Sequence, residues 1–261
     1  MQKRYRTSRV TLALKAMKRF PLYKENGAQM LVAGLLSGEG SNMRKILEYQ
    51  YEHTDCAYSV ALLFSDNAKS NATAIGKDFN LPVFYRDIQS FYATQDLKKN
   101  DLSLRHLFDD ETKIILDAFH ISTIALAGYA SVISSELIEN FLCINIHPAD
   151  LSKEEKGKRK YTGLHAVEDA LREGEKELRS TTHIVNDTID GGEILLISDS
   201  ISVKREWSTK AHQKHLKEQG DWIIFPKTLS LIAEKKIHRD ADGKLFYIEQ
   251  HIPKGVYFNE L

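Results

Sequence analysis

The chain has 261 residues, with 36 basic and 36 acidic side chains and a formal net charge of zero at neutral pH. This balance excludes a protein that binds nucleic acid or an acidic surface through its overall charge. Apolar residues make up 42% and charged residues 28% of the sequence, as in a globular enzyme that can bury a full core. Only two cysteines are present and no apolar run is long enough to span a membrane, so we expect a cytoplasmic protein without a disulfide framework or membrane partner.

Residues 1–28 form a basic N-terminal extension in which the only acid is Glu25. Apolar residues between positions 10 and 17 recur at helical spacing and predict a short amphipathic helix. An Arg-rich, acid-poor start is also typical of a transit peptide or a nucleic-acid-binding arm. We favour an extension that packs against the domain or a neighbouring subunit.

The continuous apolar run at residues 30–36 is typical of a strand buried on both faces of a parallel sheet. A turn at residues 37–42 follows, and then an amphipathic helix that we expect Ser41 or Asn42 to cap. Backbone N–H groups at such a helix start form a phosphate site, although the pattern also fits an ordinary tight turn. A dinucleotide-binding fingerprint fits less well, because its third glycine would fall at Met43.

Strands and helices then alternate along the chain. The predicted segments are strands at residues 60–64, 81–85 and 123–126, helices at 68–79 and 97–108, and a helix after the turn at Gly128. Such alternation implies an α/β fold with an open, mostly parallel, Rossmann-like sheet. Ligands bind beyond the carboxyl ends of the strands in such sheets, so the turns at residues 38–42 and Gly128 should lie on one rim.

A strand at residues 143–147 ends in polar side chains. Asn145 and His147 are two residues apart and therefore share a face, and Pro148 stops the strand. A later strand, residues 183–185, leads to Asp190 and a Gly-Gly pair.

An amide, an imidazole and a carboxylate at two strand ends are the groups that acyl transfer to an amine requires. An asparagine amide can stabilise an oxyanion, and a carboxylate can relay the proton of the attacking amine. The histidine can donate to the same oxygen when protonated, a form that we expect the carboxylate to favour by raising its pKa. No nucleophilic serine or cysteine is needed if the amine attacks directly.

The C-terminal part changes pattern. Residues 209–233 predict a long helix broken or kinked at Gly220 and Pro226, and residues 237–239 and 245–249 predict a hairpin. We therefore expect a catalytic domain at residues 29–206 and a C-terminal helix and hairpin, residues 207–261, packed on the same domain.

Together these motifs resemble the glycinamide ribonucleotide formyltransferase family. The resemblance is carried by Asn145-Ile-His147-Pro148, by the segments at residues 161–165 and 183–192, by the turn at residues 37–42 and by Leu126-Ala-Gly128-Tyr129. It covers about residues 30–256 and leaves the basic extension outside.

Membership would imply the formyltransferase fold and transfer of a formyl group from 10-formyltetrahydrofolate to a primary amine of a phosphorylated acceptor, without a metal. Position by position, the resemblance implies four groups of site residues. They are the catalytic trio Asn145, His147 and Asp190; the phosphate-binding Gly40, Ser41, Asn42 and Gly128; the folate-binding Tyr129, Ser131, Val132, Ile133, Val185 and Asp187; and the supporting His165 and His183. Asp221 stands where the family has an acidic residue that holds the ribose.

The sequence departs from the family in three places. The loop at residues 151–160 is longer and basic, with Thr162 in place of a proline, and Ser131 replaces an arginine. Asp221 is one methylene shorter than the expected side chain. The basic loop either holds an anionic group of a substrate or is simply a solvated surface.

The acceptor therefore stays open. Glycinamide ribonucleotide, the acceptor of purine biosynthesis, leads over another amine such as an amino-sugar nucleotide. A formyltetrahydrofolate hydrolase and a non-catalytic nucleotide-binding module are the other classes considered. A homodimer is left open.

Overall fold

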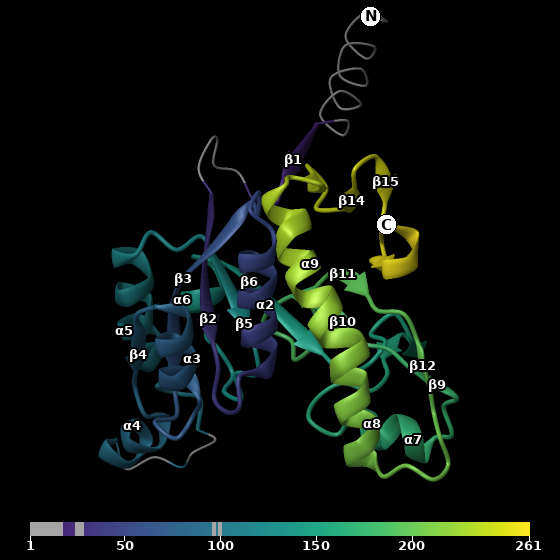
Figure 1. The fold of residues 1–261 in the computed structure, drawn as a ribbon, viewed down its shortest axis with the longest axis horizontal. Coiled ribbons are helices and arrows are strands. Elements are labelled where there is room, and N and C mark those ends of the chain that lie inside the picture. Colours follow the sequence, from purple (N-terminus) through teal and green to yellow (C-terminus); the bar gives the residue numbers. More distant parts are fainter. Residues whose placement is uncertain (1–17, 24–28, 96–97, 99–100) are drawn as a thin grey trace, which may run out of the picture.

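The computed structural model describes residues 18–23, 29–95, 98 and 101–261. At its centre is an eight-stranded sheet with strand order β16-β11-β10-β6-β5-β2-β3-β4 (Figure 1). Its strands are β2 (Met30–Leu35), β3 (Tyr58–Ser65), β4 (Val83–Tyr85), β5 (Thr123–Leu126), β6 (Leu142–His147), β10 (Thr181–Ile184), β11 (Ile194–Ile197) and β16 (Val256–Tyr257). Strands β2 to β6 of this sheet run parallel, whereas β10 is antiparallel to both of its neighbours. The predicted α/β class with an open, mostly parallel sheet is confirmed.

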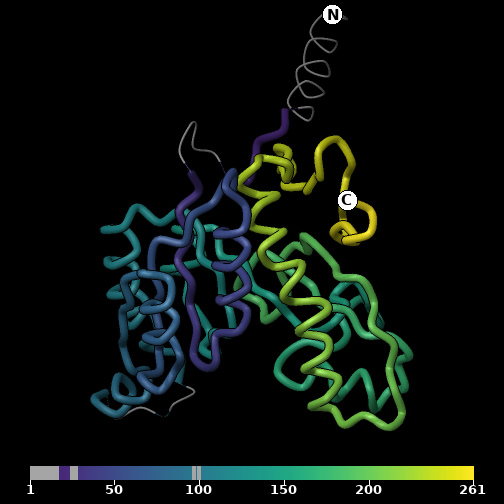
Figure 2. Tube along the Cα trace, in the orientation of Figure 1, coloured from purple at the N-terminus to yellow at the C-terminus, as the bar shows by residue number. Residues whose placement is uncertain are grey.

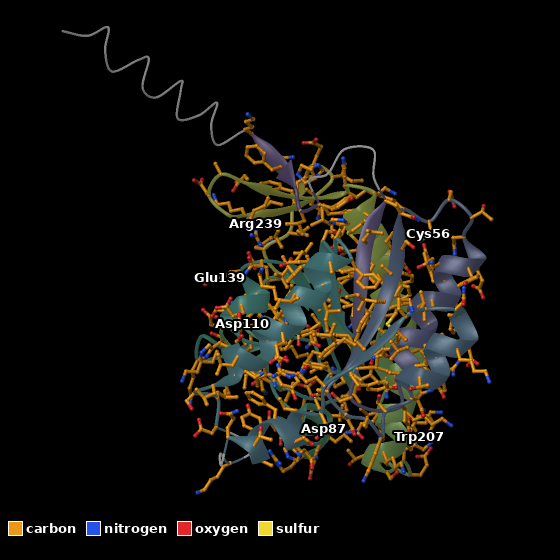
Figure 3. All side chains as sticks on the ribbon, turned by 90° about the vertical axis from the view of Figure 1, so that its left-hand side faces the viewer. Cys56, Asp87, Asp110, Glu139, Trp207 and Arg239 are labelled. Atoms are coloured by element: carbon orange, nitrogen blue, oxygen red, sulfur yellow. The ribbon has the colours of Figure 1, made fainter. Side chains whose placement is uncertain are left out.

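A second, four-stranded sheet lies at the end of the molecule where the last long helix finishes (Figures 1 and 2). Its strands, in order, are β1 (Arg19–Pro21), β13 (Ile237–Asp240), β14 (Leu245–Tyr247) and β15 (Gln250–His251). Arg239 of β13 marks this sheet in Figure 3. The predicted terminal hairpin is confirmed, and β1 from the N-terminal extension pairs with it. The helix expected near the start of the chain lies outside the described residues.

Helices cover both faces of the large sheet. Those on one face are α2 (Ser41–Glu52), α3 (Ala72–Phe79) and α9 (Trp222–Ala233), and those on the other are α4 (Ile88–Thr94), α5 (Arg105–Ala118) and α6 (Ser135–Ile138). Alternate strand residues divide between the two cores, because side chains of a strand point to opposite faces. In β6, Ile144 and Ile146 belong to the first core and Cys143 to the second.

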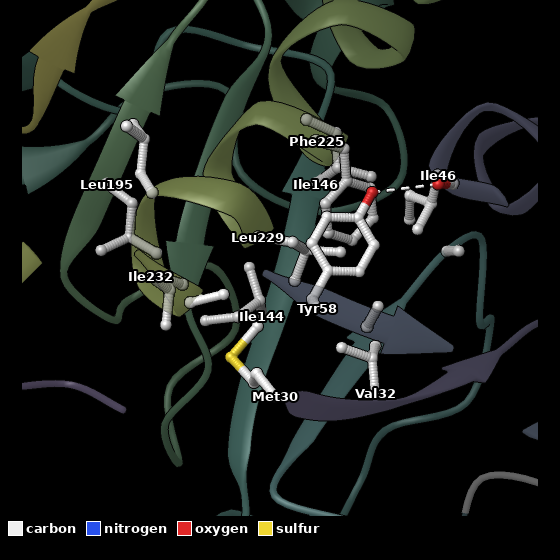
Figure 4. Close-up of a cluster of buried hydrophobic side chains, with 14 of the residues drawn as sticks. Met30, Val32, Ile46, Tyr58, Ile144, Ile146, Leu195, Phe225, Leu229 and Ile232 are labelled. Carbon is white, nitrogen blue, oxygen red and sulfur yellow. Dashed lines mark hydrogen bonds between the residues drawn. The ribbon is translucent and has the colours of Figure 1, made fainter. Parts of the chain in front are cut away.

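Helix α9 packs directly over the strand that carries the candidate site. Phe225 and Leu229 of α9 lie beside Ile144 and Ile146 of β6 (Figure 4). Both α9 side chains are fully buried, so replacing either by alanine would cost about 2–5 kcal/mol of stability. This packing fixes β6, and therefore its polar end, in one position.

Helix α9 continues from α8 (Thr209–Leu216) through a π-helical segment, Lys217–Asp221. The predicted interruption at Gly220 is thus confirmed as a widened turn, of the kind that is frequent at functional sites. Pro226 lies inside α9. Among the described residues, no helix is long and apolar enough to cross a membrane.

The remaining elements are short. They are the hairpin β7 (Glu154–Glu155) and β8 (Lys158–Arg159), α7 (Ala166–Arg172), the paired strands β9 (Glu177–Leu178) and β12 (Ile201–Ser202), and the 3-10 turn Phe258–Glu260. A small core holds several of them together and includes Tyr161, Val167, Leu178, Ile201 and Leu216.

Two local predictions were wrong. The helix expected at residues 97–108 begins at Arg105 instead and runs to Ala118, with Phe108, Thr112 and Leu116 on its buried face at intervals of four. Neither Ser41 nor Asn42 caps α2, because the N-cap is Gly40, which has a left-handed backbone and offers no side chain.

Candidate active site

The register between β6 and β10 brings the first polar side chains together. His183 lies opposite Asn145 and Thr181 lies opposite His147 in this antiparallel pair. Residues directly opposite each other on one face are close enough to interact. The amide nitrogen of Asn145 is accordingly 3.2 Å from Nε2 of His183.

Asp190 joins them from the loop that follows β10. A side chain on Gly192 would lie 1.7 Å from the carbonyl oxygen of Ile184, so only glycine lets the loop turn back so tightly. Asp190 has a φ of 53°, a left-handed conformation that aspartate tolerates better than most residues. The loop therefore returns the carboxylate of Asp190 to the end of β6.

The carboxylate lies between the two imidazoles. Oδ2 is 3.4 Å from Nδ1 of His147, and Oδ1 is 3.5 Å from Nε2 of His183. The backbone N–H of Gly163 donates to Oδ2 at 2.7 Å. All three side chains are at least nine-tenths buried.

Backbone carbonyls fix which imidazole nitrogens carry protons. Nε2 of His147 lies 2.7 Å from the carbonyl oxygen of Tyr161 and must donate, because a carbonyl only accepts. Nδ1 of His183 likewise donates to the carbonyl of Ile184 at 2.9 Å. In its neutral form His183 therefore accepts from the amide of Asn145, while Nδ1 of neutral His147 is bare and faces Asp190.

The charge states differ from expectation. Burial lowers the pKa of His147, aided by the charges of His183 and Arg159, and this outweighs the raising effect of Asp190 and of the Tyr161 carbonyl. The carboxylate does raise the pKa of His147, as expected, but burial outweighs it, so the protonated form expected of this histidine is not favoured. Burial alone would raise the pKa of Asp190, but His183, His147 and the N–H of Gly163 bring it below its usual value. The resting pair is a neutral His147 beside an ionised Asp190.

A pocket of 290 Å³ opens next to this group. Asn145, His183 and Asp190 line it, whereas His147 lies behind Asp190 and is not part of the lining. All six predicted folate-binding residues contribute to the wall: Tyr129, Ser131, Val132, Ile133, Val185 and Asp187. The structure thus places His183 at the pocket and His147 one layer deeper.

A polar network that sequence reasoning missed supports the pocket wall. Arg105 and Asp109 form a buried ion pair at 3.1 Å. Arg105 also donates to the hydroxyl of Tyr129 at 3.2 Å, and the N–H of Ser134 donates to Asp109 at 2.6 Å. The hydroxyl of Ser131, which stands in place of a family arginine, donates to the buried Asp66. Only the spacing of four between Arg105 and Asp109 was visible in the sequence.

The turn after β2 borders the turn after β5, as predicted. The N–H of Ser37 donates to the carbonyl of Gly128 at 3.0 Å, and the N–H of Ala130 donates to the hydroxyl of Ser37 at 2.8 Å. Gly40 has a φ of 66°, and a Cβ there would lie 2.5 Å from Ile75 and 2.6 Å from Leu36. The turn is therefore held rigidly on the rim that also carries the end of β6.

A hydrogen bond connects Asn42, at the start of α2, to Asp221 in the π-helical segment. The amide of Asn42 donates to Oδ2 of Asp221 at 3.2 Å, and the hydroxyl of Ser180 donates to Oδ1 at 2.5 Å. Burial raises the pKa of Asp221 despite both hydrogen bonds. Oδ1 of Asn42 is buried and has no hydrogen-bond partner.

His165 does not join the site. Its side chain is 76% exposed and lies 3.2 Å from Glu168, so the expectation that it supports the trio does not fit this geometry. Other residues contact the trio instead. Arg159, at the end of β8, donates to the backbone carbonyl of Asp190. The carbonyl of Tyr161 accepts from His147, and the N–H of Gly163 donates to Asp190. Nothing in the sequence pointed to these backbone contacts.

The basic segment is not a uniform group of free cations. Lys160 is paired with Glu173 at 2.7 Å, while Lys156 and Lys158 are exposed. Within the residues that the structure describes, no three His, Cys, Asp or Glu side chains are grouped as metal ligands.

Comparison with known proteins agrees with this geometry. Residues 30–229 match the formyl transferase family. Phosphoribosylglycinamide formyltransferase from Haemophilus influenzae is 26% identical over 231 residues, which cover 88% of this chain and 99% of that protein. The human trifunctional purine biosynthetic protein adenosine-3 is 25% identical over 221 residues, which cover 84% of this chain but 20% of the human protein.

Solved structures share the fold. Phosphoribosylglycinamide formyltransferase from Coxiella burnetii has a TM-score of 0.73 at 21% identity and covers 88% of this chain and 100% of its own. Glycinamide ribonucleotide transformylase 1 from Symbiobacterium toebii has a TM-score of 0.70 at 23% identity, covering 81% of this chain and 91% of its own. Because the family match spans most of the sequence, the chain belongs to the formyl transferase family.

Proposed function

We propose that this enzyme transfers a formyl group from 10-formyltetrahydrofolate to the primary amine of glycinamide ribonucleotide, a step of purine biosynthesis. The observation that carries the proposal is the group formed by Asn145, His183 and Asp190, which opens into a pocket lined by the predicted folate-binding residues. The family supplies the formyl donor, and the names of the relatives favour the acceptor.

The reaction requires one proton to move from the attacking amine to the leaving nitrogen of the folate. As the amine nitrogen bonds to the formyl carbon, the formyl oxygen becomes an oxyanion, which the amide of Asn145 can stabilise. His183 accepts one N–H of that amide and so fixes the direction of the other. Asn145 is therefore placed to donate into the pocket.

Asp190 and His147 handle the proton as a pair. The ionised Asp190 lines the pocket and accepts the proton lost by the amine, with the bare Nδ1 of His147 beside it as a second acceptor. Proton transfer by positioned groups of this kind contributes about 10²–10⁴ in rate. The proton then passes to the leaving nitrogen as the carbon–nitrogen bond breaks.

The acceptor would lie across the rim. Backbone N–H groups at Gly40, Ser41 and Asn42, where α2 begins, would hold the phosphate with Gly128 nearby, because a helix start attracts anions. Asp221 would hold the ribose. The two unpaired cysteines, Cys56 and Cys143, favour a reducing cytoplasm as the location.

The test is an acceptor panel. Purified enzyme is incubated with 10-formyltetrahydrofolate and glycinamide ribonucleotide, an amino-sugar nucleotide, or no amine. Release of tetrahydrofolate is followed by absorbance, and the formylated product is identified by mass spectrometry. We expect turnover with glycinamide ribonucleotide at least 100-fold above the other arms. Equal release of tetrahydrofolate without an amine would indicate a hydrolase. Faster turnover with the amino-sugar nucleotide would show that this compound, and not glycinamide ribonucleotide, is the acceptor.

A further inference from the structure

The hairpin β7–β8 is a built element rather than a loose basic loop. Glu154 pairs with Arg159 and Glu155 with Lys158 in antiparallel register. The two residues between the strands, Lys156 and Gly157, both have positive φ values, 52° and 75°. Two-residue turns with this backbone match the twist of the adjoining strands and give a well-defined hairpin.

The base of the hairpin is held on both sides. The N–H of Lys160 donates to the carbonyl of Lys153 at 2.9 Å, and Lys153 contacts Glu175 at 2.5 Å. The hydroxyl of Tyr161 lies between two carboxylates, 3.0 Å from Glu173 and 2.8 Å from Glu175, and its single proton is shared between them. These contacts connect the hairpin to the end of α7 and limit its movement.

Arg159 is the last residue of β8, and its guanidinium donates to the backbone carbonyl of Asp190. The contact is made to the main chain, so it acts on the whole Asp190 residue and leaves the carboxylate free for His147 and His183. Asp190 is in a left-handed conformation at the end of an exposed loop, whose own turn bond, from the N–H of Gly191 to the carbonyl of Thr188 at 2.9 Å, leaves the carbonyl of Asp190 to Arg159. A cation that binds the carbonyl can support this position, since hydrogen bonds from charged donors are roughly twice as strong as neutral ones.

We propose that Arg159 is a positioning residue for formyl transfer, because it holds the backbone of Asp190 where the carboxylate meets both histidines. The proposal rests on the proposed function. The family's short loop at this place is replaced here by a hairpin, which gives the longer insertion a role in catalysis rather than in substrate binding. A loss of Arg159 should therefore affect the rate of transfer and not the affinity for either substrate.

The experiment compares Arg159→Ala, Arg159→Lys and Arg239→Ala with the parent enzyme. Arg239 in strand β13 is the matched control. It is also an arginine, and it forms an ion pair at 2.8 Å with Glu193, which lies three residues after Asp190. We expect Arg159→Ala to lower kcat at least tenfold while both KM values stay within about twofold. Arg159→Lys should recover part of the loss, because lysine retains one charged donor, and Arg239→Ala should match the parent.

Hydrogen–deuterium exchange gives a readout that does not depend on activity. Arg159→Ala should raise exchange in the segment at residues 185–191, and Arg239→Ala should not. A kcat within twofold of the parent, or a raised KM at unchanged kcat, would overturn the proposal, as would unchanged exchange in that segment. An inactive parent enzyme would instead contradict the proposed function, and exchange would still decide the role of Arg159. If Arg159→Ala does not fold, Arg159→Lys carries the same comparison.

Discussion

The two ends of the site handle buried charge in opposite ways. Around β6 and β10 the carboxylate of Asp190 lies between His147 and His183, and its pKa is lowered. At the start of α2 the carboxyl of Asp221 is buried with Ser180 and Asn42, two neutral donors, and its pKa is raised. One carboxyl is therefore stabilised as an anion, and the other is not.

The two ends also differ in how completely their buried polar groups are hydrogen-bonded. The transfer end is complete without a ligand, because hydrogen bonds and charges already set its protonation states. The start of α2, where we propose that the phosphate binds, keeps an unpartnered oxygen, Oδ1 of Asn42, beside a carboxyl that is poorly solvated. A buried polar atom without a partner is costly and calls for an explanation. The start of α2 is therefore less fully hydrogen-bonded than the transfer end.

The largest expected effect comes from the transfer end. Asn145→Ala, His147→Ala and Asp190→Asn should each lower kcat by about 10²–10⁴, because they remove groups that act in the transition state. Steady-state kinetics with the best acceptor measure this. Circular dichroism should show folded protein in each case.

The combination of variants sharpens this expectation. Asp190→Asn together with His147→Ala should cost little more than either alone, since both residues act on one proton. Near-normal turnover of His147→Ala would remove it from the mechanism.

The pH dependence should follow the lowered pKa of His147. The active form has a neutral His147 beside an ionised Asp190, so activity is lost as His147 gains a proton at low pH. Burial lowers this pKa from about 6.5, and the acid limb of kcat/KM should lie below pH 6.5, with about a tenfold loss for each pH unit beneath it. Rates measured between pH 4.5 and 8, after a check that the enzyme survives each pH, test this. An acid limb above pH 6.5 would contradict it.

At the start of α2, Asp221→Asn should raise the stability of the protein while it weakens binding of the acceptor. The folded state raises the pKa of Asp221, so it binds a proton more tightly than the unfolded chain does. Its contribution to stability is therefore present at low pH and is lost as the pH rises from about 3.9 through the raised value. An asparagine avoids the buried charge, and its amide could donate to the free Oδ1 of Asn42.

We expect Asp221→Asn to melt about 2–4 °C higher than the parent at pH 7, which corresponds to about 1 kcal/mol, with a smaller difference at pH 4. The acceptor KM should rise about tenfold and the donor KM should not change. Calorimetry at the two pH values and steady-state kinetics measure these effects. A variant that is less stable than the parent at pH 7 would show that the charge of Asp221 is well compensated.

The sequence predicted the fold and the positions along the chain that meet at the site, because both follow from periodicity and strand ends. The side-chain alternation that places Asn145 and His147 together is local, and so is the Gly-Gly pair after Asp190. The resemblance also located the residues that line the pocket. Contacts between distant segments were not predictable in this way.

Burial and backbone contacts account for most of what was missed. The pKa of His147 depends on the protein packed around it, so its direction could not be inferred from one neighbouring carboxylate. The contact of Arg159 with the carbonyl of Asp190 joins residues 31 positions apart through a main-chain atom. His165 matched the family motif but points to the surface, since α7 begins immediately after it.

The smallest expected effect concerns Glu39 in the turn before α2. If the phosphate binds there, the exposed carboxylate of Glu39 opposes it by Coulomb repulsion, which solvent and salt weaken. Glu39→Gln should therefore lower the acceptor KM about two- to threefold at low salt, with the gain shrinking as salt is added, and leave the donor KM and kcat unchanged. Gly40 is unsuited to this test because a side chain there would collide with Leu36 and Ile75. Glu52→Gln at the other end of α2 is the matched control, about 18 Å away by helix geometry, so the lowest salt used is about 0.1 M, where the Debye length is about 10 Å. An equal gain in both variants would reflect net charge alone, and an unchanged acceptor KM would place the phosphate elsewhere.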